Sequence, residues 1–203
     1  MSEGTDTSAG DTPLPEDATP VSRLALRDGA VVLAALSLWA GADAWHTVTS
    51  LAFAQLLAVL DGFLAGAALV GLAHEWGHFA GARLSGGVAP TRGIDSLFPI
   101  FDFDLVNSDP RSFRAMSIGG NIAHWAVPLL LLLFLPLETA GRAALFATTF
   151  GVAVADSVTE FPVIQKAYSG SSPAESFVGL TGDKLRRDQK IGAAAGVVLF
   201  LLI

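Results

Sequence analysis

Long apolar runs, separated by short charged segments, constrain the fold of this chain more than any other feature. The first run follows Arg27 to Gly29 and continues to about residue 49, and the others cover approximately residues 53–83, 116–137, 142–164 and 191–203. A membrane-spanning helix needs about 20 predominantly apolar residues, a length that the first four runs reach and the fifth does not. The sequence therefore predicts an all-α polytopic membrane protein with four to five transmembrane helices in a lipid bilayer.

The segment before the first run has a different composition. Residues 1–22 are rich in Ser, Thr, Pro, Gly and acidic residues, so they cannot bury enough apolar surface to become ordered. We expect a disordered acidic N-terminal tail, followed by one transmembrane domain over residues 23–203. The net charge of −7 says little about nucleic acid, because six of the acidic residues lie within the first 28. No basic cluster is recognisable, so we expect no nucleic-acid partner. The chain has no cysteine, so any metal site must use His, Asp and Glu.

Basic residues between the runs predict an orientation. They precede the first run, gather between the second and third, and follow the fourth, whereas only Arg142 marks the connection between the third and fourth. Because cytoplasmic loops carry the excess of Lys and Arg, we expect the N-terminus in the cytoplasm. Between the second and third runs, residues 97–106 alternate in their second half with period two, which predicts a short β segment at the membrane surface.

A His-Glu-x-x-His motif stands near the end of the second run, at His74, Glu75 and His78. On a helix, residues four apart share a face, so both imidazoles can bind one metal ion, and Glu75 beside them can act as a general base. Zinc accepts imidazole and carboxylate ligands. Ionisable residues within an apolar helix mark a functional site by default, although such a cluster can also join helices by hydrogen bonds.

From His74 to Arg83 the sequence resembles the site-2 protease family of intramembrane zinc metalloproteases. In order along the chain, a sheet-forming segment and a Gly-rich helix start follow, and the similarity extends over roughly residues 60–165. The family has Gly-Pro-x-x-Asn where this chain has Gly120 to His124, so Asn121 replaces the proline and His124 replaces the asparagine. The resemblance implies one zinc per chain, Glu75 as the catalytic base, and a membrane-protein substrate.

A catalytic zinc generally has three protein ligands, and the family takes the third from an Asp in a later Leu-Asp-Gly motif. This chain has no such motif there, and Leu60-Asp61-Gly62 precedes the histidines instead. Asp156 is the only Asp in the fourth apolar run, so we predict His74, His78 and Asp156 as metal ligands. Glu160, one turn further on the same face, is the alternative ligand or a contact to the substrate.

Two residues of the third run are further candidates. His124, together with Asn121, either contacts the substrate or its oxyanion near the metal, or it only forms a hydrogen bond to a neighbouring helix. The function expected from motif and resemblance is an intramembrane zinc-dependent endopeptidase that hydrolyses a peptide bond in or near a substrate transmembrane segment. The alternatives are a non-catalytic membrane scaffold or binding protein with the same fold and, less favoured, a metal transporter.

Overall fold

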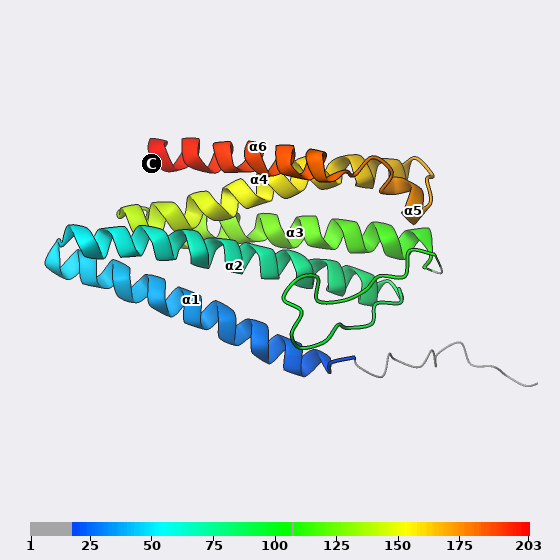
Figure 1. Cartoon of the computed structure of the whole chain (residues 1–203), viewed down its shortest axis with the longest axis horizontal. Coiled ribbons are helices and arrows are strands. Elements are labelled where there is room, and N and C mark those ends of the chain that lie inside the picture. Colours follow the sequence, from blue (N-terminus) through cyan, green and yellow to red (C-terminus); the bar gives the residue numbers. More distant parts are fainter. Residues whose placement is uncertain (1–17, 107) are drawn as a thin grey trace, which may run out of the picture.

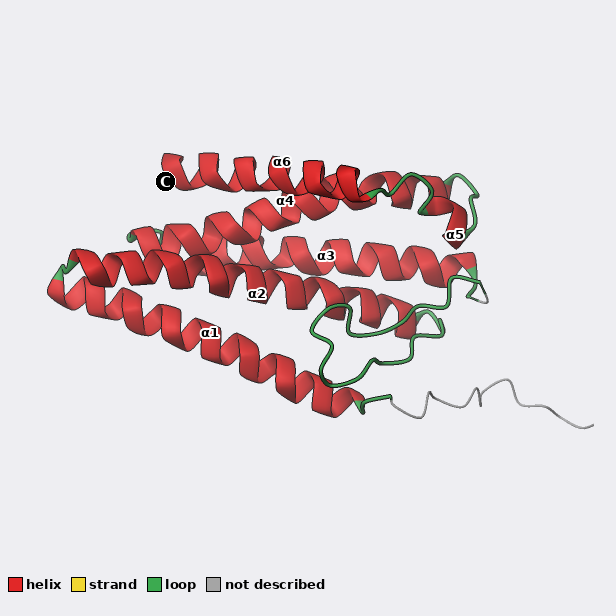
Figure 2. Ribbon diagram, in the orientation of Figure 1, coloured by secondary structure: helices red, strands yellow, loops and turns green. Residues whose placement is uncertain are grey.

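A computed structural model describes residues 18–106 and 108–203 (Figure 1). Its helices run in the order α1 (Val21–Thr49), α2 (Ala52–Leu84), α3 (Pro110–Phe134), α4 (Ala140–Tyr168), α5 (Pro173–Ser176) and α6 (Gly182–Leu202). Figure 2 shows the five long helices side by side as a bundle, with α5 and the connection between α2 and α3 at one end. The first 17 residues of the predicted disordered tail lie outside the described residues.

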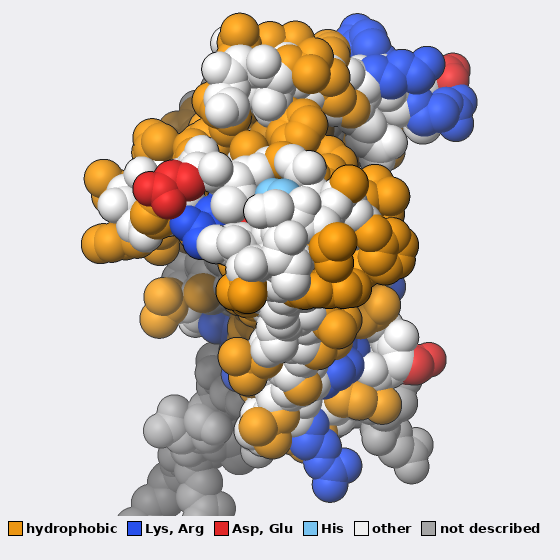
Figure 3. Space-filling model, turned by 90° about the vertical axis from the view of Figure 1, so that its left-hand side faces the viewer, with side chains coloured by type: hydrophobic (Ala, Val, Ile, Leu, Met, Phe, Trp, Pro, Cys, Tyr) orange, Lys and Arg blue, Asp and Glu red, His pale blue; other side chains and the backbone are white. Residues whose placement is uncertain are grey.

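Four of these helices, α1, α2, α3 and α4, are long and apolar enough to cross a membrane. Large apolar side chains remain exposed along them, among them Leu33, Leu64 and Leu133. Seen end-on, hydrophobic side chains spread around the outside of the bundle (Figure 3). A soluble protein rarely exposes such continuous apolar surface, whereas lipid covers it without cost. The predicted class, an all-α polytopic membrane protein, is therefore confirmed.

Local sequence signals explain where the helices begin and end. The first two apolar runs, which the sequence barely separates, are divided at Ser50, whose φ of 55° ends α1 in the left-handed conformation. Helix α3 begins at Pro110, earlier than the apolar run, because the Asp109 side chain accepts a hydrogen bond from the amide of Arg111 and proline suits the first helical position. Helix α1 begins at Val21, so the last two residues of the expected tail are helical.

The last apolar run forms only the second half of α6, whose first half is charged. The Asp188 side chain is fully buried and pairs with Lys184 and Arg187, while Thr159 of α4 donates to it at 3.2 Å. These contacts fix α6 along α4. Helix α6 is not among the four helices with the length and hydropathy of a membrane span.

Pairs of glycines four residues apart allow the helices to approach closely; they are Gly62 and Gly66, Gly77 and Gly81, and Gly192 and Gly196. A Cβ built on Gly77 of α2 would lie 2.5 Å from the Cβ of Ala123 in α3. Similarly, a Cβ on Gly62 would lie 2.7 Å from the carbonyl oxygen of Gly141 in α4, and one on Gly151 would lie 2.8 Å from that of Gly192 in α6. Small residues at this spacing are the usual packing device of membrane helices, and here they bring α2 and α4 close enough to share a site.

The connection between α2 and α3 folds back over the bundle end. Thr91 and Phe101 form an isolated antiparallel bridge, and Asp102 donates its amide to the carbonyl of Pro90 at 2.9 Å. The β segment predicted for residues 97–106 is thus reduced to a bridge, and the described residues contain no regular strand. Two of its aromatic side chains turn inward, because Phe101 is buried in the core against Phe79 and Phe103 packs against the same core, whereas Phe98 stays exposed.

The first helix anchors this connection. The Arg27 guanidinium donates to the carbonyl oxygens of Ile94 at 2.7 Å and Ser96 at 2.6 Å, and it pairs with Asp28 at 2.7 Å. Asp28 in turn accepts a hydrogen bond from the indole of Trp76 in α2 at 2.9 Å. A chain of polar contacts therefore runs from the connection through α1 to the helix that carries the His pair.

Candidate metal site between α2 and α4

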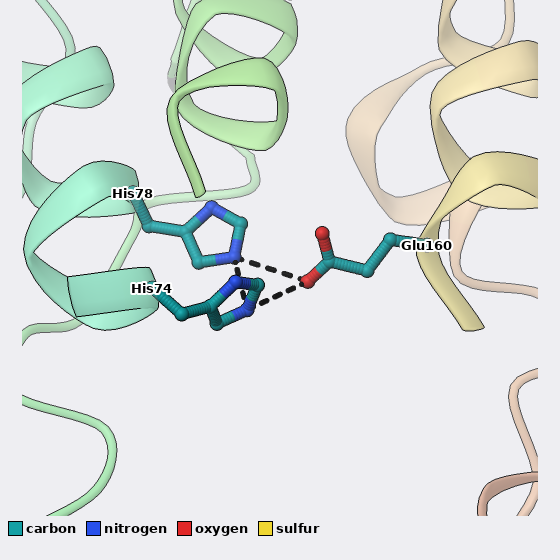
Figure 4. Close-up of side chains that lie close together, drawn as sticks. All are labelled: His74, His78 and Glu160. Carbon is teal, nitrogen blue, oxygen red and sulfur yellow. Dashed lines mark hydrogen bonds and ion pairs between the residues drawn. The ribbon is translucent and has the colours of Figure 1, made fainter. Parts of the chain in front are cut away.

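The two motif histidines lie one turn apart on the face of α2 that looks toward α4. Their Nε2 atoms are 2.9 Å apart. Glu160 of α4 faces both rings, and its Oε1 lies 3.0 Å from Nε2 of His74 and 3.1 Å from Nε2 of His78. Figure 4 shows the two imidazoles and the carboxylate pointing to one spot. Two nitrogens and one oxygen therefore converge within the membrane part of the bundle.

These three atoms suit a zinc ion. Tetrahedral ligands at zinc–ligand distances near 2.1 Å lie about 3.4 Å from one another, and the observed separations of 2.9 to 3.1 Å fall a few tenths of an ångström below that. Two imidazoles and one carboxylate are a donor set found in catalytic zinc sites, where a fourth position stays open. His74, His78 and Glu160 thus fit the metal that the motif implies.

Helix α3 forms a hydrogen bond with each of the three side chains, through an atom that does not face the cluster. Nδ1 of His78 donates to the carbonyl oxygen of Met116 at 2.8 Å, Asn121 donates to Oε2 of Glu160 at 2.6 Å, and Nδ1 of His124 lies 3.0 Å from Nδ1 of His74. Because a carbonyl only accepts, the His78 ring hydrogen sits on Nδ1, and the lone pair of Nε2 faces the cluster. Such outer partners are typical of metal-binding histidines and carboxylates.

Asp156, the acid that the sequence favours as third ligand, lies one turn before Glu160 and contacts other atoms. Its Oδ2 is 3.7 Å from Nδ1 of His124 and 4.0 Å from Nδ1 of His74, so it approaches the far side of the His74 ring. It joins a second possible ligand group with His74 and His124, whereas Glu160 groups with His74 and His78. The arrangement favours Glu160 over Asp156 as the partner of the motif pair.

Glu75 extends from the same turn of α2 toward the connection between α2 and α3. Its Oε2 accepts the amide hydrogen of Ile100 at 3.1 Å. Glu75, His78 and Glu160 line one cavity of about 390 Å³, so the predicted base and two of the converging groups face the same space.

Apart from Ser117 and Thr159, apolar side chains line the rest of that cavity. Helices α3 and α4 contribute Met116 and Val163, the connection contributes Phe101 and Phe103, and Phe177 closes it beyond α5. A cavity with a few polar groups at one end and apolar walls elsewhere is typical of a ligand site.

Asn121 and His124, the two candidate contacts to a substrate or oxyanion, contact the converging groups. Asn121 lies behind Glu160, and its amide also donates to the carbonyl of Ser117 at 3.1 Å. His124 is fully buried. No sequence signal could have predicted the hydrogen bonds from His78 to Met116 and from Ile100 to Glu75, because Met116 and Ile100 form them with backbone atoms.

The fold and the site together define a polytopic membrane protein whose transmembrane helices bring a His pair and a carboxylate to one point. Comparisons with protein-family models, with curated proteins and with solved structures found no match.

Proposed function

We propose that this protein is an intramembrane zinc-dependent endopeptidase with one zinc held by His74, His78 and Glu160. The observation that carries the proposal is the convergence of these three groups beside Glu75, in a cavity lined by apolar side chains. The resemblance of residues 74–83 to the site-2 protease family supports it further.

When bound, zinc polarises the substrate carbonyl and stabilises the negative charge that develops on its oxygen. Glu75 removes a proton from the attacking water and transfers it to the leaving nitrogen. His74 and His78 are oriented by α3, and Glu160 is held by the amide of Asn121. The mostly apolar walls around this space lower its polarity, which strengthens electrostatic interactions within it.

The surroundings of Glu75 suit an unwound transmembrane segment as the substrate. A helical peptide hides its carbonyls in its own hydrogen bonds, so a transmembrane substrate must unwind before cleavage. The connection between α2 and α3 offers a partly extended backbone next to Glu75, with which an unwound segment can pair as an added strand. Phe101, Val163 and Phe177 provide an apolar space for a side chain of that segment.

The zinc content of detergent-purified protein tests the metal site. We expect about one zinc per chain in wild type, loss of zinc in His74→Ala and Glu160→Ala, and retention in Asp156→Ala. Loss in Asp156→Ala with retention in Glu160→Ala would return the third position to Asp156, as the sequence suggested. A wild-type protein that binds no zinc after reconstitution would refute the metal site and favour the non-catalytic membrane scaffold.

Cleavage of a reconstituted transmembrane substrate tests the activity. Proline substitutions within residues 97–106 remove backbone donors, so they should reduce cleavage without changing zinc content. Normal cleavage in these variants would rule out strand pairing, and the zinc site would stand.

A further inference from the structure

His124 forms a contact that neither the motif nor the proposed ligand set requires. Its side chain is fully buried in the bundle, where an imidazole needs hydrogen-bond partners. Nδ1 lies 3.0 Å from Nδ1 of His74. The two ring planes differ by 16° and the ring centroids are 5.1 Å apart, so the rings meet nearly edge to edge with both nitrogens between them. This alignment suits a hydrogen bond in the plane of both rings.

The other nitrogen of His124 continues the contact into α4. Nε2 lies 3.4 Å from Oγ of Ser157, and the same oxygen accepts the indole hydrogen of Trp125 at 2.8 Å. A serine oxygen can accept two hydrogen bonds. His124 can therefore donate from Nε2 to Ser157 and accept at Nδ1, which leaves Nδ1 of His74 as the donor between the two rings.

The direction of this hydrogen bond determines the tautomer of His74. A neutral imidazole carries one ring hydrogen, so a hydrogen on Nδ1 leaves the lone pair of His74 on Nε2, the atom that faces His78 and Glu160. The opposite direction would put the hydrogen on Nε2, where it would compete with a metal ion. His78 has the same arrangement through the carbonyl of Met116.

We propose that His124 is a positioning residue that accepts the Nδ1 hydrogen of His74 and so keeps Nε2 of His74 ready to bind the metal. This inference rests on the proposed zinc site. It develops the second of the two roles that the sequence left open for His124, a hydrogen bond to a neighbouring helix, rather than the substrate contact. It also accounts for the buried position of the side chain, which is hidden behind the His74 ring.

A rival interpretation uses the same residues as a second ligand group. Nδ1 of His74, Nδ1 of His124 and the carboxylate of Asp156 lie close enough to hold a cation. In that case His74 would bridge two ions, and neither Nδ1 could carry a hydrogen. The number of ions bound per chain separates the two interpretations.

The experiment compares His124→Ala, His124→Asn and His124→Gln in the full-length, detergent-solubilised protein. Asparagine carries a polar atom at the position of Nδ1, whereas glutamine carries its polar group near the position of Nε2, so this pair separates the two contacts of the ring. Zinc affinity is measured by competition with a chelator of known affinity, and the cobalt-substituted protein gives an absorption spectrum that reports ligand geometry. Loss of an outer partner typically weakens metal binding about 10- to 100-fold.

We expect wild type and His124→Asn to bind one zinc with similar affinity and similar cobalt spectra. His124→Ala and His124→Gln should bind zinc about 10- to 100-fold more weakly. Wild-type affinity in both weakened variants would overturn the inference and leave the zinc site intact. Two ions per wild-type chain, with one lost in both His124→Ala and Asp156→Ala, would overturn it in favour of a second ligand group. Absence of zinc from wild type would overturn the proposed site and this inference together.

Discussion

Gly77→Ala tests whether close packing of α2 against α3 shapes the site. A Cβ at this position would lie 2.5 Å from the Cβ of Ala123 and would also overlap the carbonyl of Gly119. Because carbon atoms in contact are normally about 3.5–4.0 Å apart, the two helices must separate by roughly 1 Å. The neighbours are backbone and a methyl group, so no flexible side chain can yield.

Overpacking of this kind costs about 1–3 kcal/mol, and 1 kcal/mol shifts Tm by about 2–4 °C in a chain of this size. We expect the metal-free Gly77→Ala protein to unfold about 2–12 °C below wild type, measured by circular dichroism in detergent. Separation of the helices should also lengthen the 2.8 Å contact between His78 and Met116 and weaken zinc binding.

Gly41→Ala is the matched control. Gly41 lies within α1, and a Cβ there would meet nothing within 4 Å. Alanine favours a helix over glycine by up to about 1 kcal/mol, so this variant should be as stable as wild type or slightly more stable. If both variants had the same Tm, the close approach of α2 and α3 would not constrain the bundle, and the reasoning would be wrong.

Four further predictions concern the site and its supports. Glu75→Gln should keep its zinc and lose at least about 100-fold in cleavage rate, because amides cannot act as general bases; activity near wild type would exclude Glu75 as the base. Val163→Trp should fill the cavity and reduce cleavage at unchanged zinc content, and unaffected cleavage would show that substrates bind elsewhere. Arg27→Ala should raise hydrogen exchange in the connection between α2 and α3 by at least about tenfold, since even one lost hydrogen bond from a charged group is worth about 1.5–3 kcal/mol, whereas Arg23→Ala should not. A side-chain hydrogen bond from Lys184, aided by Arg187, holds the pKa of Asp188 below its ordinary value. The ionised Asp188 therefore stabilises the fold above about pH 4, and this stabilisation is lost on further acidification. Asp188→Asn should lower Tm at neutral pH and make Tm less dependent on pH in the acid range.

The sequence predicted the helices well because bilayer thickness dictates their length. The acid that faces the two motif histidines was harder to predict. Asp156 and Glu160 share one face of α4, and chain order alone cannot specify how far α4 extends along α2 or how it is rotated toward the histidines. The longer Glu160 side chain reaches both imidazoles, which depends on tertiary packing at the glycine contacts.

The predicted β segment failed for a related reason. Alternation of Phe101, Asp102, Phe103 and Asp104 fits a strand, but the aromatic side chains find burial against α2 and α3. Packing thus determined the backbone path more strongly than local pattern. The role of α3 was also hidden in the sequence, because the Met116 contact comes from a carbonyl that any residue would supply.

The residues of the site are distributed over three helices, which has a consequence for biogenesis. Helices of a membrane protein can insert one by one and associate afterwards. His74 and His78 lie on α2, Glu160 lies on α4, and their outer partners all lie on α3, so an inserted but unassembled chain carries no complete set. Metal binding at this site would then be coupled to the final association step. Chains whose helices have not yet packed would therefore hold no metal at this site during membrane insertion.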